Sequence, residues 1–479
     1  MDLLFNNQHV SEDAFVFQLA ELKQHCACAP LATEELRIDR LSRAIGLLRE
    51  HQHELVSAFS DDFGYRCPTE TRLSDIMAST EALRYTREHL QQWIQPELRE
   101  TPFPDTKALI DYRPKGQIGI ISPWNFPVVL AFGPLAGVLA AGNSAVLKPS
   151  ELTPRGGALL CQLIERYFGA DEISTLQGDA TAGALFTEQP FDHLIFTGST
   201  HVGKKVMQAA AKNLVPVTLE LGGKSPVVIS TSADIKVSAE RIMTIKTYNA
   251  GQICISPDYV LLPEDKLDEF TQHARQFIET SYPKLQDNPD YTAIINDHHY
   301  RRLLNALDDA RQRHLEIIPL DSTSDLMARH PERKLPPTLV INPPLECPLM
   351  QEEIFGPVLP VLTYQQFDKA LLQITQAPRP LALYYFGDEQ SEISQIRDQS
   401  LSGSLVINDV LSHVLLESLP FGGIGPSGMG RYHGKEGFLE FSHARSVFFQ
   451  SKQGDSNLLM RAPYTQQTQE FIDSQINNA

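Results

Sequence analysis

Short β-rich runs alternate with longer helical stretches between residues 117 and 249, and this alternation constrains the fold more than any other feature. Such a pattern is typical of parallel βαβ units, in which each helix crosses from one strand to the next. The predicted strands are 117–122, 144–148, 193–197, 216–221 and 226–230, and the predicted helices are 128–141, 154–168, 202–212 and 234–249. Thr153 and Pro154 are expected to be the N-cap and first residue of their helix.

The length of 479 residues, with 42% hydrophobic and 21% charged residues, predicts two domains that each bury a core. Helical spacing of apolar residues over 31–98 predicts an all-helical opening region, which a Pro-rich segment at 101–105 ends. A second α/β series begins with the helix 234–249, so we place a domain boundary near Leu221–Gly223. We expect one domain from 1–98 and 115–221, a second from 222–438, and a polar C-terminal tail over 451–479.

Charge and cysteine usage exclude several classes of protein. The net charge is 41 − 59 = −18, which disfavours a nucleic-acid partner. Six widely spaced cysteines do not form a secreted disulfide framework, so we expect a cytoplasmic protein. Neither a signal peptide nor a membrane partner is expected. The tight cluster of His25, Cys26 and Cys28 lacks a second pair at zinc spacing, so no metal site is predicted.

Cys254 lies just beyond a predicted helix, at a Gly-containing turn and before Pro257. Such a position can expose a thiol to a pocket, although a free cysteine is more often a small buried hydrophobe. Glu220 places a single carboxylate inside an apolar strand, immediately before two glycines. Because strand interiors avoid unpaired charge, a general base with a raised pKa is one explanation, and exposure at the strand end is the other.

Two polar residues follow other predicted strands. Asn125 comes after strand 117–122, at the carboxyl end where α/β proteins bind ligands, and its amide can stabilise an oxyanion. An ordinary Asn in a Pro-bounded turn is the alternative. Lys148 ends strand 144–148 and Glu151 follows three residues later, as ligands of ribose hydroxyls or as a solvated ion pair.

Three glycine-rich segments resemble nucleotide-binding loops. Residues 198–205 nearly match the nucleoside-triphosphate loop, but Lys205 replaces the hydroxyl that would hold Mg²⁺. Residues 222–225 lack the first glycine of that loop, since Thr218 stands in its place. Residues 423–428 satisfy GxGxxG literally, but no clear strand-to-helix step surrounds them, so a Rossmann fingerprint is not expected.

Seven segments together resemble, in order and spacing, the motifs of the aldehyde dehydrogenase superfamily. They are 123–127 (PWNFP), 148–151 (KPSE), 196–199 (FTGS), 219–224 (LELGGK), 251–254 (GQIC), 352–357 (EEIFGP) and 420–423 (PFGG). Residues 254–259 (CISPDY) and 441–443 (FSH) resemble the class 3 branch, and within it the chain is most similar to bacterial coniferyl aldehyde dehydrogenases. This resemblance implies two Rossmann-like α/β domains, a homodimer, and a bridging β element built from 99–114 and 439–450.

The resemblance also implies roles for individual residues. Cys254 would be the nucleophile, Glu220 the base for a deacylating water, and Asn125 an oxyanion donor. Several residues would bind the cofactor. Lys148 and Glu151 would hold the adenosine ribose, Gly198 and Ser199 would lie against the pyrophosphate, and Glu353 and Phe355 would lie at the nicotinamide end. Trp124 is implied as a further cofactor-binding residue.

The implied reaction is NAD(P)-dependent oxidation of an aldehyde, aromatic or aliphatic, to an acid through a thiohemiacetal and a thioester on Cys254. Glu151 favours NAD because a carboxylate repels a 2′-phosphate, but use of NADP stays open. One alternative is a CoA-acylating relative, which Glu220 disfavours because transfer to a thiol needs no water-activating base. A binding protein that kept the fold is the other alternative, and Cys254, Glu220 and Asn125 together disfavour it. The loop near His413 is expected to line the substrate mouth.

Overall fold

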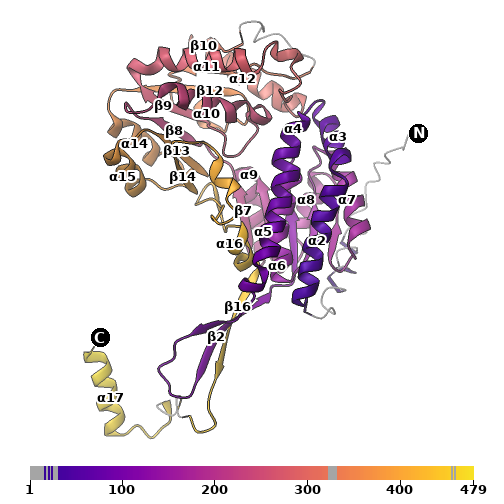
Figure 1. Cartoon of the computed structure of the whole chain (residues 1–479). Helices are drawn as coiled ribbons and strands as arrows, with labels where there is room; N and C mark the ends of the chain where they lie inside the picture. Colours follow the sequence, from indigo (N-terminus) through magenta and orange to yellow (C-terminus); the bar gives the residue numbers. More distant parts are fainter. Residues whose placement is uncertain are drawn as a thin grey trace.

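Two mainly parallel sheets flanked by helices form the body of the protein, and a small antiparallel sheet projects from it (Figure 1). The computed structural model describes residues 16–17, 20–21, 23–24, 31–321, 332–454, 457 and 460–478. His25, Cys26 and Cys28 therefore lie outside the described residues. The α/β architecture confirms the fold class predicted from the alternation of strands and helices.

The first sheet has six strands in the order β15-β7-β6-β3-β4-β5, and β15 is antiparallel to β7 while the others run parallel. Its strands are β3 (Gln117–Ile121), β4 (Ser144–Lys148), β5 (Ile173–Thr175), β6 (His193–Gly198), β7 (Val217–Leu221) and β15 (Gly428–Met429). Its crossover helices are α6 (Val129–Ala141), α7 (Pro154–Tyr167), α8 (Ala180–Thr187) and α9 (Thr200–Ala211). Each predicted element of this region is present within two residues of its expected ends.

The second sheet has seven strands in the order β10-β11-β12-β9-β8-β13-β14, with β10 antiparallel to β11. Its strands are β8 (Pro226–Ile229), β9 (Tyr259–Pro263), β10 (Glu316–Pro319), β11 (Thr338–Ile341), β12 (Val358–Tyr364), β13 (Ala382–Phe386) and β14 (Ser404–Ile407). The helices of this unit are α10 (Ile235–Thr247), α11 (Leu267–Ser281), α12 (Asp297–Gln312), α13 (Pro348–Gln351), α14 (Phe367–Gln376) and α15 (Gln390–Gln399). Short helical turns occur at η2 (Tyr248–Gly251), η3 (Glu264–Lys266), η4 (Leu285–Asp287) and η5 (Ser412–Leu415).

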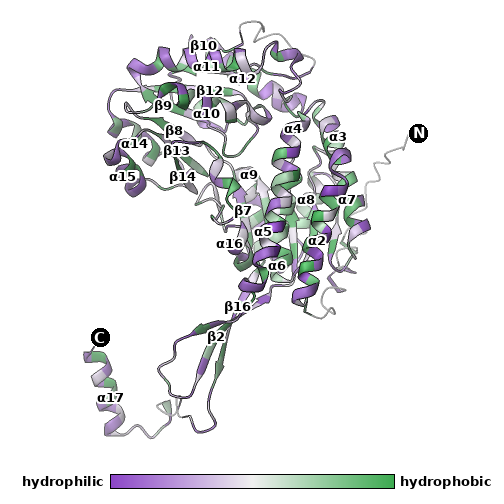
Figure 2. Cartoon of the chain, in the orientation of Figure 1, coloured by the Kyte–Doolittle hydropathy of each residue, from purple (hydrophilic) through white to green (hydrophobic). Residues whose placement is uncertain are grey.

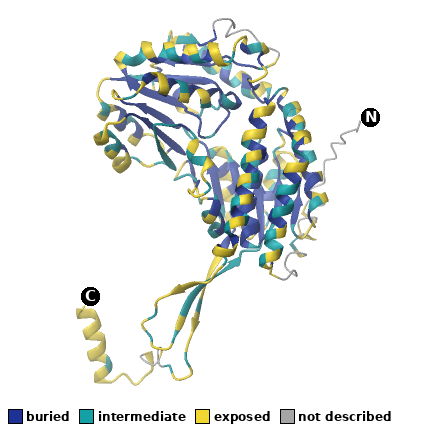
Figure 3. Ribbon diagram, in the orientation of Figure 1, coloured by how far each residue is buried: buried dark blue, intermediate teal, exposed yellow. Residues whose placement is uncertain are grey.

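The opening region is helical, as its apolar spacing predicts. It comprises α2 (Glu34–Glu50), α3 (Gln52–Phe63), α4 (Pro68–Thr71), the π-helical turn η1 (Arg72–Met77) and α5 (Ala78–Trp93). Helices α2 and α5 pack against α6, so they cover one side of the first sheet. Strands of both sheets are buried while the outer helix faces are exposed, and hydropathy follows the same division (Figures 2 and 3).

The third sheet has the order β1-β2-β16 and is antiparallel throughout. Its strands are β1 (Glu97–Arg99), β2 (Lys107–Pro114) and β16 (Ser442–Phe449), which fits the β element expected from 99–114 and 439–450. Helix α16 (Gly434–Glu440) packs on α6, and β15 pairs with β7, so the chain returns to the first sheet before the expected limit at residue 438. The tail contains helix α17 (Gln466–Asn477), which has no buried residue. No helix in the described ranges is long and apolar enough to cross a membrane.

The start of α7 lies where the sequence predicts it, but its cap is different. Thr153 is the N-cap residue, yet its side chain makes no capping hydrogen bond and faces the Ser150 carbonyl. The Asp62 carboxylate of α3 instead accepts hydrogen bonds from the Arg155 and Gly156 N–H groups at 3.0 and 2.8 Å. A carboxylate at a helix N-terminus also interacts favourably with the helix dipole. A tertiary contact therefore replaces the local cap that was expected.

A partly buried ion-pair cluster ties α2 to the turn before β5. Glu172 Oε1 lies 3.0 Å from Arg40 Nε and 2.8 Å from Arg43 Nη2, and its side chain is 13% exposed. Burial alone would raise the pKa of Glu172, but hydrogen bonds from Arg43, the Gly169 N–H and Arg40 lower it to about 2.

Replacing Glu172 by Gln should lower the free energy of unfolding by about 1–3 kcal/mol at pH 7, because two arginines lose their partner. Since the pKa is depressed in the folded state, this stabilisation is present above the ordinary value of 4.5 and disappears as pH falls toward 2. Thermal melts at pH 7 and pH 3 measure the difference between wild type and variant. An equal difference at both pH values would contradict the assignment.

Candidate active site

Four residues singled out in the sequence meet at the carboxyl edge of the first sheet. Strands β7, β6, β3 and β4 are adjacent and parallel, and Glu220, Gly198, Asn125 and Lys148 stand at or just beyond their carboxyl ends. Ligands bind in α/β proteins at this edge, because the loops and helix N-termini there point outward together. The alternation of strands and helices therefore accounts for this clustering.

The turn before Cys254 has an uncommon backbone conformation. Asn249 (φ 49°, ψ 31°) and Ala250 (φ 51°, ψ 34°) are left-handed, and Gly251 follows with φ 72°. A left-handed residue other than glycine costs about 1–2 kcal/mol, so the surrounding structure must hold this turn in place. It directs the chain from the end of α10 toward the first sheet and leaves Cys254 half-buried.

Reciprocal hydrogen bonds join this turn to Asn125. The Asn125 Nδ2 donates to the Gln252 carbonyl at 3.1 Å, and the Asn249 Nδ2 donates to the Asn125 carbonyl at 3.1 Å. An amide group carries two N–H donors, and among the described residues the second Asn125 N–H has no acceptor, so it can donate to an oxygen atom. The Gln252 side chain anchors the turn by donating to the Asn249 and Ala293 carbonyls and accepting from the Ile295 N–H.

Two buried carboxyl groups accompany the thiol. Neither carboxylate oxygen of Glu220 has a hydrogen-bond partner among the described residues, and burial together with the charge of Glu440 raises its pKa well above the ordinary value. Glu353 Oε1 is likewise unpaired within the described chain, and burial and the charge of Asp258 raise the pKa of Glu353 to about 8. Unpaired buried acids of this kind are typical of functional sites.

The environment of Cys254 is apolar and acidic. Burial, followed by the charges of Glu353 and Glu220, raises the pKa of the Cys254 thiol to about 12. The electrostatic influence of both acids on the thiol is consistent with all three groups lying in one site. A positive charge close to the sulfur is required to form the thiolate at neutral pH.

The residues expected to hold a dinucleotide lie along the same edge. The Lys148 side chain is buried, donates to the Gly178 carbonyl at 3.1 Å and lies 3.6 Å from Glu151 Oε2. Burial lowers the pKa of Lys148. Ser199 is the N-cap of α9, and its hydroxyl accepts from the Val202 N–H. The end of a strand followed by a helix N-terminus fits a phosphate group, while Glu151 is exposed enough to meet a ribose.

An aromatic cluster lies where the loop after β3 meets the segment before β12. The Trp124 ring packs edge-on against Phe355 with centroids 5.4 Å apart, and it packs at a tilt against His299 with centroids 5.2 Å apart. Phe355 has a φ of 46°, a strained value for a residue with a side chain. Trp124 from the first sheet and Phe355 from the second therefore meet in one cluster.

The sequence analysis missed the residues that hold Glu353 and Phe355 in place. Lys224 donates to Asp258 and to the carbonyls of Leu349 and Glu352, and Asp258 Oδ1 accepts from the Ile354 N–H at 2.8 Å. Lys224 and Asp258 both occur within the recognised motifs, and that was the available signal. Their function as clamps depends on a contact between segments about 100 residues apart, which no local pattern predicts.

The glycine-rich segments behave as their surroundings suggest. Residues 423–428 form a turn that leads into the two-residue strand β15 and not into a helix. Residues 198–205 do span a strand-to-helix step, from β6 into α9.

Within the part of the chain that the structure describes, no group of three His, Cys, Asp or Glu side chains is placed to hold a metal.

A half-buried cysteine near an amide donor and two buried acids, at the carboxyl edge of a parallel sheet, is an arrangement that suits cysteine-dependent oxidation. Residues 23–447 match the Aldehyde dehydrogenase family. The chain belongs to this family, and its activity is NAD(P)-dependent oxidation of aldehydes.

Similar proteins support this assignment. The chain is 52% identical over 442 residues to coniferyl aldehyde dehydrogenase of Pseudomonas sp. (strain HR199 / DSM 7063), covering 92% of each chain. It is 44% identical to a probable coniferyl aldehyde dehydrogenase of Caulobacter vibrioides, covering 98% of this chain and 99% of the other. The structure of substrate-bound Staphylococcus aureus AldH superposes with a TM-score of 0.90 at 36% identity, over 96% of this chain and 99% of that one.

Gly222 allows the second sheet to bring Glu353 against the first. A Cβ atom at position 222 would lie 2.0 Å from Glu353 Oε2, which is far inside van der Waals contact. Replacing Gly222 by Ala should displace this carboxylate and weaken binding of NAD by about tenfold, as expected for loss of a charged hydrogen bond. Titration with NADH, followed by its fluorescence, measures the change.

Gly46→Ala is the matched control. A Cβ atom there would have 3.8 Å to its nearest neighbour, and position 46 is inside α2, where Ala is favoured. This control should bind NADH like wild type and be equally or more stable. Unchanged NADH affinity in Gly222→Ala would show that the position of Glu353 does not matter for the cofactor.

Proposed function

We propose that Cys254 attacks the aldehyde carbon, Asn125 stabilises the resulting oxyanion, and Glu220 activates the water that releases the acid. The observation that carries this proposal is the reciprocal hydrogen bonding between Asn125 and the turn of Cys254, next to two buried acids with carboxylate oxygens that no described residue pairs. A tetrahedral oxyanion beside Cys254 would meet the free N–H of the Asn125 amide.

The residues at the sheet edge fit a bound dinucleotide. The Glu353 Oε1, which no described residue pairs, can accept a hydrogen bond from a ribose hydroxyl. The adenosine ribose would lie against Lys148 and Glu151, and the pyrophosphate would lie at the N-terminus of α9. NAD(P)⁺ supplies a cationic hydride acceptor when bound. Glu353, Trp124 and Phe355 would orient that end of the cofactor toward the sulfur.

The chain's own groups carry the remaining steps. The Cys254 thiol gives its proton to solvent water, and its sulfur forms a bond to the carbonyl carbon while the C=O electron pair moves to the oxygen, which Asn125 holds as an alkoxide. This carbon then loses its hydride to the bound cofactor as the C=O bond forms again, which leaves a thioester on Cys254. Glu220 then accepts a proton from a water molecule that attacks the thioester, the C–S bond breaks, and the departing sulfur takes that proton to restore the thiol. The pKa of Glu220 is raised above its ordinary value, which makes its carboxylate a stronger base for this step.

The variants Cys254→Ala and Glu220→Gln separate the two half-reactions. Cys254→Ala should lose at least 10³-fold in NADH formation, because it lacks the nucleophile. Glu220→Gln should form NADH in a single burst and then turn over at least tenfold more slowly, leaving an acyl adduct on Cys254 that mass spectrometry detects. Rapid turnover without an adduct in Glu220→Gln would refute the proposed base.

We further propose that the substrate is an aromatic aldehyde of the coniferyl type. Support comes from the named activity of the 52% identical Pseudomonas protein and from an aromatic cluster beside the acids. Phe421 stacks on His433 with centroids 5.3 Å apart, and Tyr432 packs edge-on against Phe421 at 5.8 Å. Burial, and then the charges of Glu220 and Cys254, raise the pKa of Tyr432, which is consistent with a place beside the catalytic groups. Flat rings of this kind suit an arylpropenal.

Purified protein should show kcat/KM at least tenfold higher for coniferyl aldehyde than for hexanal, and higher with NAD than with NADP. The cofactor preference follows from Glu151, which repels a 2′-phosphate. Glu151→Gln should therefore narrow the NAD to NADP ratio severalfold. Spectrophotometric assays at 340 nm, with each aldehyde and each cofactor in turn, test both statements. Faster oxidation of hexanal would reject the aromatic substrate.

A further inference from the structure

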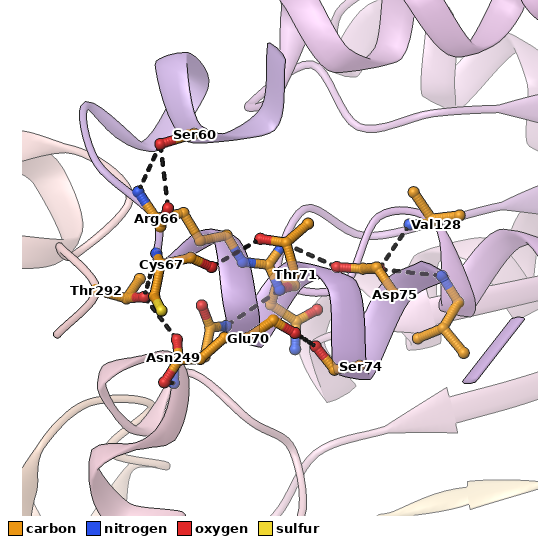
Figure 4. A network of polar contacts seen from close by, with 12 residues as sticks. Ser60, Arg66, Cys67, Glu70, Thr71, Ser74, Asp75, Val128, Asn249 and Thr292 are labelled. Atoms are coloured by element: carbon orange, nitrogen blue, oxygen red, sulfur yellow. Dashed lines mark hydrogen bonds and ion pairs between the residues drawn. The ribbon is translucent and has the colours of Figure 1, made fainter. Parts of the chain in front are cut away.

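A buried polar network on the opening helices reaches the turn that carries Cys254 (Figure 4). Glu70 of α4 is 6% exposed, and its Oε1 accepts the Asn249 N–H at 3.1 Å while its Oε2 accepts the Thr292 hydroxyl at 2.6 Å. The Tyr248 hydroxyl also donates to the Glu70 carbonyl. This carboxylate therefore contacts the first of the left-handed residues in the turn.

The same helical segment also forms hydrogen bonds with the chain just after Asn125. Arg66 and Asp75 form an ion pair at 2.9 Å with both side chains fully buried. Asp75 Oδ1 accepts hydrogen bonds from the Val128 and Val129 N–H groups at 2.9 and 3.1 Å, where α6 begins four residues after Asn125. The segment 66–75 thus holds the loops of both Asn125 and Cys254.

We propose that Glu70 is a positioning residue of the active site, which fixes the distance and orientation between the Cys254 sulfur and the Asn125 amide by holding the Asn249 turn. Asn249 connects Glu70 to Asn125, because its backbone N–H donates to the Glu70 carboxylate and its side chain donates to the Asn125 carbonyl. This inference rests on the proposed roles of Cys254 and Asn125. It assigns a function to a region outside the sheet-edge motifs.

The energetic balance supports this role. Two consecutive left-handed residues other than glycine cost about 2–4 kcal/mol together, and persist when neighbouring groups hold them. Burial raises the pKa of Glu70 to about 7, while the Thr292 and Asn249 hydrogen bonds and Arg66 favour its charged form. A buried carboxyl group contributes less to stability than an apolar residue of the same size would. Its hydrogen bond to the strained turn explains why a carboxylate occupies this position.

The variant Glu70→Gln nearly keeps the volume but retains a single acceptor oxygen, so it cannot accept from both Asn249 and Thr292, and it removes the negative charge that strengthens both hydrogen bonds. The burst rate of NADH formation with coniferyl aldehyde should fall at least tenfold, and so should the alkylation of Cys254 by iodoacetamide. The KM for NAD should stay within twofold, because no cofactor residue contacts Glu70. Stopped-flow absorbance and mass spectrometry measure these rates per folded enzyme.

Two controls separate positioning from folding. Glu172→Gln removes a charged group that also bonds two neighbours, but away from the site, so it should lower the melting temperature while leaving both rates unchanged. Thr292→Val removes one partner of Glu70 and Thr292→Ser retains it, so Ser should keep the wild-type burst rate while Val loses part of it. These comparisons do not depend on how well Glu70→Gln folds.

The results for Cys254 and for Glu70 are separable. If Cys254→Ala forms no NADH while the wild type does, the proposed function is supported, whatever the result for the Glu70 variant. The positioning role is overturned if Glu70→Gln keeps burst and alkylation rates within twofold of wild type. It is also overturned if the rates fall only in proportion to the fraction of unfolded protein, or if KM for NAD rises in parallel.

Discussion

The pair of hydrogen bonds between Asn125 and the turn 249–252 is the interaction on which the active site depends. Asn125 follows strand β3 of the first sheet, and the turn 249–252 follows helix α10 of the second unit, so neither unit contains the site alone. The bonds are buried and therefore costly to leave unmade. They fix the turn that leads to Cys254 against Asn125 and, in the same contact, fix the two units to each other.

This dependence explains why the site contains so many locally unfavourable features. Left-handed residues at 249–250 and a positive φ at Phe355 each cost free energy. So do the buried oxygens of Glu220 and the Glu353 Oε1, which have no hydrogen-bond partner among the described residues. Contacts from a distance hold them, such as the Lys224–Asp258 clamp beneath Glu353. Stability of the large hydrophobic core around both sheets is what allows the strain to persist.

The sequence predicts the strands and helices of the first sheet closely, because buried parallel strands and crossover helices have strong local patterns. It also places Asn125, Lys148 and Glu220 at one edge, since parallel strands end on the same side. It does not reveal Glu70 or Asp258, because their partners lie about 180 and 100 residues away and an isolated acid is usually solvated. Thr153 shows the converse, where a strong local cap signal is displaced by Asp62 of another helix.

The electrostatics of the site link cysteine reactivity to cofactor binding. Burial, followed by the charges of Glu353 and Glu220, raises the pKa of the Cys254 thiol to about 12, so the protonated thiol is favoured at neutral pH. Burial also raises the pKa of Glu353 to about 8 and that of Glu220 well above its ordinary value, so the protonated form of each acid is favoured too. A cationic ring close to the sulfur would lower the pKa of all three groups, because a positive charge favours the thiolate and the carboxylates. Binding of the hydride acceptor would therefore supply the positive charge that thiolate formation requires.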